Sequence, residues 1–200
     1  MIKLSKNWEF NVLGIDNFNI QEKLTPYYDF IRKNHKLIEG DICEVGVYRG
    51  FSLLATAMLL KELGSNKIVW GFDSFEGLPE DWHLESKEVY STGGKIPKVP
   101  PHVTLIPGWF EETLPLFLAK HEEDVALINI DCDIYSSTKT VLDLLSARIK
   151  KGTIIIFDEY IGNLHWEEDE HKAFMESIET YHWKYEYVCY SAYTKQVVVK

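Results

Sequence analysis

The sequence predicts an α/β fold in which helices cover both faces of a mostly parallel sheet, and three observations support this prediction. Apolar runs typical of buried strands alternate with stretches of helical periodicity along most of the chain. Three of these runs are nearly continuous in Val, Ile, Leu and Phe, as expected of strands covered on both faces. The last two runs lie too close together for a helix to connect them, so they must form an antiparallel hairpin. The fold predicted is a doubly wound sheet with a terminal hairpin.

The elements follow from these patterns in chain order. Strands are predicted at 41–47, 67–73, 102–106, 125–131 and 153–158. Helices are predicted at 50–63, 111–120, 136–149 and 168–182. The final hairpin pairs 185–193 with 196–200 across a turn at Thr194 and Lys195, which brings the number of strands to seven.

Two segments fall outside this alternation. Residues 1–40 are predicted to be an N-terminal helical segment or lid, with a helix at 21–37 near the ligand edge of the sheet. Residues 79–101 contain four prolines and a Gly-Gly pair, which predict a long loop that is either a lid or plain surface. The remaining residues, 41–200, form one predicted domain.

Composition and charge exclude several classes of function. The 200 residues carry a formal net charge of −10, whereas a nucleic-acid surface would be basic. No apolar run approaches the roughly 20 residues of a transmembrane helix, and no signal peptide is visible, so no membrane contact and a cytoplasmic location are expected. Cys43, Cys132 and Cys189 are scattered, which predicts neither a disulfide framework nor a thiolate metal site.

The segment EVGVYRG after the first predicted strand indicates a ligand-binding turn. Gly46 allows a tight turn, and Gly50 begins a helix whose first N–H groups point to the same edge. The glycine spacing is longer than in a dinucleotide fingerprint and follows an acid, which suits a cationic ligand without phosphates such as S-adenosylmethionine, although such turns also arise by chance. The residues expected at the ligand are Glu44, Gly46, Val47, Tyr48, Arg49, Gly50 and Ser52.

The next two strand ends carry residues suited to a nucleoside. Asp73 ends the second strand, where an acid commonly accepts hydrogen bonds from ribose hydroxyls, and Ser74 follows it. Trp109 and Phe110 follow the third strand, and they either line an adenine pocket or belong to the core.

The fourth and fifth predicted strands end in carboxylates. Asp131 ends the fourth, and Asp158 and Glu159 end the fifth, so adjacent parallel strands bring them to one edge. Carboxylates this close stay ionised only beside a positive charge, and Mg²⁺ prefers oxygen ligands. We therefore predict a metal site at these residues. Asp133 is a further ligand, a base, or the cap of the next helix.

These motifs resemble those of the macrocin O-methyltransferase (TylF-type) family, a metal-dependent branch of the class I S-adenosylmethionine-dependent methyltransferases. The matching pieces are EVGVYRG, GFDSFEGLP, IDCDIYSST and GTIIIFDEY. The resemblance implies a Rossmann-like seven-stranded sheet, with Glu44, Gly46 and Asp73 on the methyl donor. It also implies Mg²⁺ bound by the three acids that end the fourth and fifth strands. The sequence departs from the family at Glu159, where an aspartate is common.

The predicted activity is transfer of a methyl group from S-adenosylmethionine to a hydroxyl of a small molecule, for which the resemblance suggests a sugar or natural product. The base would be Asp131, Asp133 or His165, the last in the loop after the fifth strand. Asp131 is also expected beside the donor. The alternatives are a nicotinamide-dependent oxidoreductase, which the glycine spacing and the hairpin disfavour, and a non-catalytic nucleoside-binding domain. A homo-oligomer is compatible with the sequence.

Overall fold

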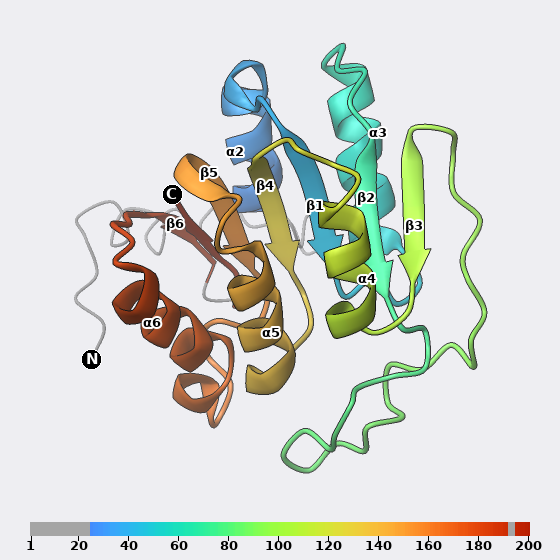
Figure 1. The fold of residues 1–200 in the computed structure, drawn as a ribbon, viewed down its shortest axis with the longest axis vertical. Coiled ribbons are helices and arrows are strands. Elements are labelled where there is room, and N and C mark those ends of the chain that lie inside the picture. Colours follow the sequence, from blue (N-terminus) through green and yellow to red (C-terminus); the bar gives the residue numbers. More distant parts are fainter. Residues whose placement is uncertain (1–24, 192–194) are drawn as a thin grey trace.

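The computed structural model describes residues 25–191 and 195–200, and these form one mixed sheet with helices on both faces (Figure 1). The strands are β1 (Asp41–Val45), β2 (Val69–Asp73), β3 (Val103–Pro107), β4 (Val125–Ile130), β5 (Ile149–Phe157), β6 (Tyr187–Tyr190) and β7 (Val197–Val199). Their order in the sheet is β3-β2-β1-β4-β5-β7-β6. The first five strands pair in parallel, and β7 is antiparallel to both β5 and β6. The predicted Rossmann-like sheet with a terminal hairpin is confirmed.

The helices divide between the two faces of the sheet. They are α2 (Thr25–Asn34), α3 (Phe51–Glu62), α4 (Phe110–Leu118), α5 (Tyr135–Leu145) and α6 (Glu170–Tyr181), with short 3₁₀ turns η2 (His35–Leu37) and η3 (Trp166–Glu168). Figure 1 shows α4, α5 and α6 in front of the sheet and α2 and α3 behind it. Leu114, Val141 and Phe174 belong to the front core, and Ile31 and Leu53 to the rear one.

Burial explains why the central strands could be recognised. Every residue of β1 and β4 is buried, because each strand has neighbours on both edges and helices on both faces. Such strands need continuous apolar sequence rather than alternation. The polar members of these strands, Asp41, Glu44 and Asn129, are therefore exceptions that require partners.

The observed bounds differ from the predicted ones mainly between α5 and β5. The predicted helix at 136–149 ends earlier, at Leu145, because the Ser146 hydroxyl and the Arg148 N–H bond to carbonyls of the last turn. The Arg148 carbonyl already accepts from the Val125 N–H, so β5 begins at Ile149 instead of 153. Residues 150–152 of β5 (Lys-Lys-Gly) are exposed and interrupt the apolar run, so the sequence pattern did not include them in the strand.

The N-terminal segment is only partly described. Residues 25–37 contain α2 and η2, and α2 packs beside α3 with Ile31 fully buried, whereas residues 21–24 of the predicted helix lie outside the described part. The cavity described below is lined by residues from Gly46 onward, so the lid role of 1–40 stays a prediction.

The long segment between β2 and β3 forms a loop, as predicted for 79–101. Its one regular feature is a two-residue bridge between Trp82 and Glu85. It runs below the carboxyl ends of the strands before rising to β3 (Figure 1). No helix within the described residues is long and apolar enough to cross a membrane.

Candidate active site

A cavity of about 400 Å³ opens at the carboxyl edge of the sheet. Its wall contains Gly46, Asp73, Trp109, Asp131 and Asp158, which follow or end β1, β2, β3, β4 and β5 respectively. The carboxyl ends of parallel strands lie on one side of a sheet. The order β3-β2-β1-β4-β5 therefore places the residues predicted to bind a nucleoside, after β2 and β3, on the same edge as the acids after β4 and β5.

Most of the residues predicted for the site lie on this wall. They are Gly46, Tyr48, Asp73, Ser74, Trp109, Phe110, Asp131, Asp133, Asp158 and Glu159. The predicted residues that do not line it are Glu44, Val47, Arg49, Gly50, Ser52 and His165. Position on the wall does not assign a role, so the roles remain predictions.

Gly46 sits where the ends of β1 and β4 nearly touch. Its φ is +87°, and a Cβ added there would lie 1.6 Å from the carbonyl oxygen of Asp131. The Asp131 N–H also donates to the carbonyl of Val45 at 2.9 Å. A side chain at position 46 therefore cannot fit without moving the backbone of Asp131.

Asp73 closes the turn that follows β1. Its Oδ2 accepts from the backbone N–H groups of Val47 and Tyr48, each at 2.7 Å, and its Oδ1 accepts from that of Phe75 at 2.6 Å. A carboxylate oxygen has two lone pairs, so Oδ2 is saturated and Oδ1 can accept one more hydrogen bond. In this conformation Asp73 can bind one ribose hydroxyl, not the pair expected from the sequence.

Glu44 lies behind the turn and not on the cavity wall. Its side chain is buried and accepts from Ser52 Oγ at 2.8 Å and from Asn129 Nδ2 at 3.1 Å. Burial raises the pKa of Glu44 to about 8, so the carboxyl is largely protonated at neutral pH. A neutral, enclosed carboxyl offers little attraction to a cationic ligand.

Glu44→Gln is expected to stabilise the protein at alkaline pH. The folded pKa of about 8 exceeds the ordinary 4.5, so stability from this group is complete at low pH and is lost as pH rises towards the folded pKa. The substitution removes that loss, and a glutamine there can accept from Asn129 Nδ2 with its oxygen and donate to Ser52 Oγ with its nitrogen. We expect a gain of up to about 5 kcal/mol at pH 9 and little at pH 5.

Urea unfolding at pH 5, 7 and 9 measures this gain. The control is Glu62→Gln, at the exposed end of α3, which should leave the pH dependence unchanged. If the free energies of unfolding of Glu44→Gln and wild type differ by the same amount at all three pH values, the raised pKa of Glu44 is contradicted.

Four carboxylates gather where β4 and β5 end. Burial, followed by the charge of Glu159, raises the pKa of Asp158 to about 6. Burial, followed by the charges of Asp158 and Asp133, raises the pKa of Asp131 well above its ordinary value. Burial and the charges of Glu159 and Asp158 likewise raise the pKa of Asp133. These groups cannot all be ionised near neutral pH unless a cation lies beside them.

Residues from other segments hold this cluster. Lys195 Nζ lies 2.9 Å from Glu159 Oε2, and the side chain of Gln196 donates to Asp158 Oδ1. Glu170, at the start of α6, is fully buried, and its Oε2 accepts from the Glu159 N–H at 3.2 Å. Its Oε1 accepts no hydrogen bond from the described residues. Sequence reasoning missed these three residues because they approach the site through tertiary contacts.

The predicted metal ligands fit a hard divalent ion in their chemistry. All their donor atoms are carboxylate oxygens, which Mg²⁺ prefers, and all three residues line one cavity. In the conformation described, however, no three His, Cys, Asp or Glu side chains of the described residues are grouped closely enough to hold a metal ion. Asp158 and Glu159 are engaged by Gln196 and Lys195 instead.

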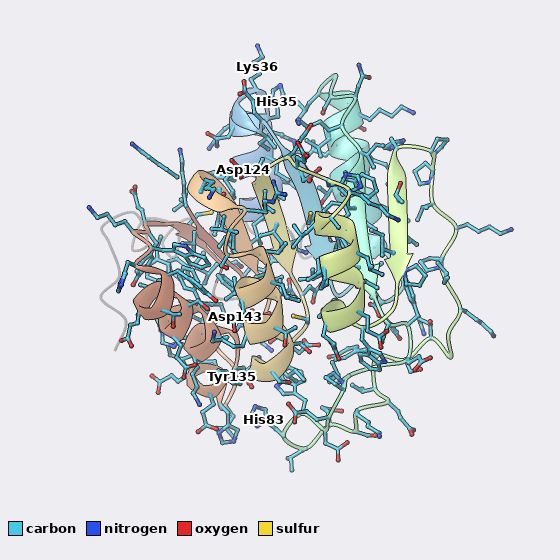
Figure 2. The ribbon with its side chains drawn as sticks, in the orientation of Figure 1. His35, Lys36, His83, Asp124, Tyr135 and Asp143 are labelled. Carbon is cyan, nitrogen blue, oxygen red and sulfur yellow. The ribbon has the colours of Figure 1, made fainter. Side chains whose placement is uncertain are left out.

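His165 lies outside the cavity, where it contacts the long loop. Its ring centroid is 4.7 Å from that of His83, and His83 Nε2 lies 2.8 Å from Asp169 Oδ2. Trp82 Nε1 donates to the same oxygen at 3.1 Å. Figure 2 shows His83 at the same end of the molecule as Tyr135, where α5 begins. These contacts fasten the loop across the carboxyl edge, and Tyr90 of the loop reaches the cavity wall.

The macrocin-O-methyltransferase (TylF) family model matches residues 22–176. An 8-demethyl-8-(2,3-dimethoxy-alpha-L-rhamnosyl)-tetracenomycin-C 4′-O-methyltransferase from Streptomyces olivaceus is 32% identical over 143 residues, covering 62% of this chain and 54% of that protein. A demethyldecarbamoylnovobiocin O-methyltransferase from Streptomyces niveus is 28% identical over 144 residues, with the same coverages. The chain thus spans about half the length of the curated relatives it matches.

Solved structures show the same fold. The calicheamicin methyltransferase CalS11 aligns with a TM-score of 0.70 at 21% identity, over 98% of this chain and 91% of that one. MycE from the mycinamycin pathway, in complex with Mg and SAH, aligns with a TM-score of 0.56 at 15% identity, over 99% of this chain and 55% of that one. At these identities the likeness concerns the fold alone.

Proposed function

The chain belongs to the macrocin-O-methyltransferase (TylF) family, and from this premise we propose that it transfers a methyl group from S-adenosylmethionine to a hydroxyl of a small molecule with the assistance of Mg²⁺. The observation that carries the proposal is the shared cavity, in which Asp73 and the acids Asp131 and Asp158 line one wall. Asp73, the residue predicted to bind the nucleoside, lies in the same cavity as the carboxylate cluster. This arrangement suits a methyl donor bound next to an acceptor that a metal ion orients.

The strand order supports a specific orientation of the donor. Asp73, Ser74, Trp109 and Phe110 follow β2 and β3, so the nucleoside belongs at that end of the cavity. The turn at Gly46 stands between them and the acids of β4 and β5. A donor whose adenosine lies over β2 and β3 would direct its methionine end and its methyl group towards those acids. The reacting hydroxyl then belongs in the acidic part of the cavity.

Asp131, Asp158 and Glu159 would hold the ion, which supplies a Lewis acid that lowers the pKa of a bound hydroxyl. We assign the proton acceptor to Asp133, because it lies on the wall whereas His165 packs against the loop outside it. Asp133 has a φ of 60°, an uncommon conformation for aspartate that is often found at functional sites. Its carboxylate would take the hydroxyl proton as the oxygen attacks the methyl group.

The acceptor we propose is a sugar hydroxyl on a natural product. The names of the curated relatives support this, since one methylates a rhamnosyl tetracenomycin and another acts at a 3″ oxygen of mycinamicin III. A sugar offers neighbouring oxygens that one ion can bind. Tyr90, whose ring contacts that of Tyr48 at 5.8 Å, places an aromatic surface beside the acids.

Ligand titration and a transfer assay test the proposed function. S-adenosylhomocysteine at 100 times its Kd should stabilise the protein by about 2.7 kcal/mol and raise its Tm, whereas NAD should not. Methyl transfer to rhamnosides should require Mg²⁺, and EDTA should stop it without abolishing S-adenosylhomocysteine binding. A Tm raised by NAD alone would contradict the proposal, and donor binding without transfer to any acceptor would favour a non-catalytic domain.

Asp73→Asn is expected to weaken S-adenosylhomocysteine binding by about 100-fold. One amide oxygen cannot accept from the N–H groups of Val47, Tyr48 and Phe75 together, so the turn loosens and the ribose contact weakens. Isothermal titration measures the affinity. Asp81→Asn, which alters an acceptor for the Lys87 N–H within the long loop, is the control and should bind normally. An affinity within 3-fold of wild type would remove Asp73 from the donor site.

A further inference from the structure

The two residues that precede β7 contact the two acids that follow β5. The strands pair antiparallel with Phe157 opposite Val197. Continuing this register beyond the ladder sets Gln196 against Asp158 and Lys195 against Glu159, and both contacts are present. The carbonyl of Lys195 also accepts from the Ile161 N–H at 3.3 Å. The pairing of β5 with β7 therefore places the ammonium group of Lys195 beside Glu159, a predicted metal ligand.

Lys195 and Asn163 together occupy one oxygen of the Glu159 carboxylate. Glu159 Oε2 accepts from Lys195 and from the Asn163 amide, while Asn163 Oδ1 accepts from the same ammonium. Two donors use both lone pairs of Oε2. The pair is only partly exposed, with 35% and 20% of the two side chains accessible, so solvent screens it incompletely. An ion that binds through Oε2 must displace the ammonium.

We propose that Lys195 competes with the divalent ion for Glu159 and thereby sets the affinity of the acidic site for that ion. The inference deepens the proposed function and rests on it for the presence of an ion. In the ion-free protein the ammonium compensates the cluster from its Glu159 end. When the ion binds, Glu159 exchanges the ammonium for it, and Lys195 keeps its contact with Asn163. Because glutamate has one more methylene than aspartate, it can reach either partner.

A double-mutant cycle on the full chain tests the competition, with Mn²⁺ as the probe and electron paramagnetic resonance to count free ion. Lys195→Gln should tighten Mn²⁺ binding by about 5- to 10-fold, since the ion no longer displaces a cation. Glu159→Gln should weaken it. In the Glu159→Gln background, Lys195→Gln should change the affinity by no more than about 2-fold, because the competition is gone. Lys151→Gln, in the exposed part of β5, is the charge-matched control and should change nothing.

The outcomes separate the inference from the function on which it rests. Unchanged or weaker binding in Lys195→Gln would overturn the competition, and so would tightening of equal size in both backgrounds, which would indicate general electrostatics. If none of the proteins binds Mn²⁺, the ion of the proposed function is itself refuted. Binding of S-adenosylhomocysteine and the Tm establish that each variant is folded, and Lys195→Met repeats the test without a hydrogen-bonding side chain.

Discussion

Asp131→Asn is expected to reduce methyl transfer by about 10³-fold or more while leaving S-adenosylhomocysteine binding largely intact. The substitution keeps the shape of the side chain and the backbone contacts to Val45 and Gly46, so the donor turn should survive. It replaces a carboxyl group that can ionise beside a cation with an amide that cannot. An amide is a poor ligand for Mg²⁺ in place of a carboxylate, so the acceptor would no longer be oriented or activated.

Rapid-quench single-turnover experiments at saturating S-adenosylmethionine measure the rate of methyl transfer itself, without a contribution from product release. Asp124→Asn is the matched control, because Asp124 immediately precedes β4 at its opposite end, far from Tyr135 (Figure 2). It should retain full activity. If Asp131→Asn turns over within 10-fold of wild type at saturating Mg²⁺, the proposed ion site is wrong. A matching loss of donor affinity would instead assign Asp131 chiefly to the donor.

The convergence of the acids could be predicted because it depends only on topology. Asp73, Asp131 and Asp158 each end an apolar run, and parallel strands deliver their ends to one edge whatever the details of the turns. Glu44 shows the limit of that argument. It lies one residue before the end of β1, and its side chain contacts Ser52 and Asn129 instead of lining the cavity.

Contacts that join distant segments could not be predicted. Lys195 reaches Glu159 only because β7 pairs with β5 in one register, and a shift of one residue would direct it elsewhere. His165 lies in the loop between β5 and α6, but the ring it contacts is that of His83, in the long loop between β2 and β3. The course of that loop is fixed by Asp169 at the start of α6, and no local periodicity encodes such a contact.

Gly46→Ala is expected to cost about 4 kcal/mol or more of stability, which is a fall in Tm of roughly 10 °C. The added methyl group would lie 1.6 Å from the carbonyl oxygen of Asp131, 2.4 Å from its carbonyl carbon and 3.1 Å from the nitrogen of Cys132. All three atoms are backbone, so no side chain can rotate away. The ends of β1 and β4 must separate, and this displaces the residue on which the predicted chemistry depends.

Gly64→Ala distinguishes this collision from backbone strain. Gly64 follows α3 with a φ of +81°, close to the +87° of Gly46, but an added Cβ there has nothing within 4 Å. The control should therefore show only the cost of a left-handed alanine, about 1 kcal/mol. Thermal unfolding compares the two variants, and S-adenosylhomocysteine titration shows whether the turn still binds. Equal losses of stability would mean that the ends of β1 and β4 are not as close as the structure shows. The proposal of one cavity that holds both the donor and the acids would then be contradicted.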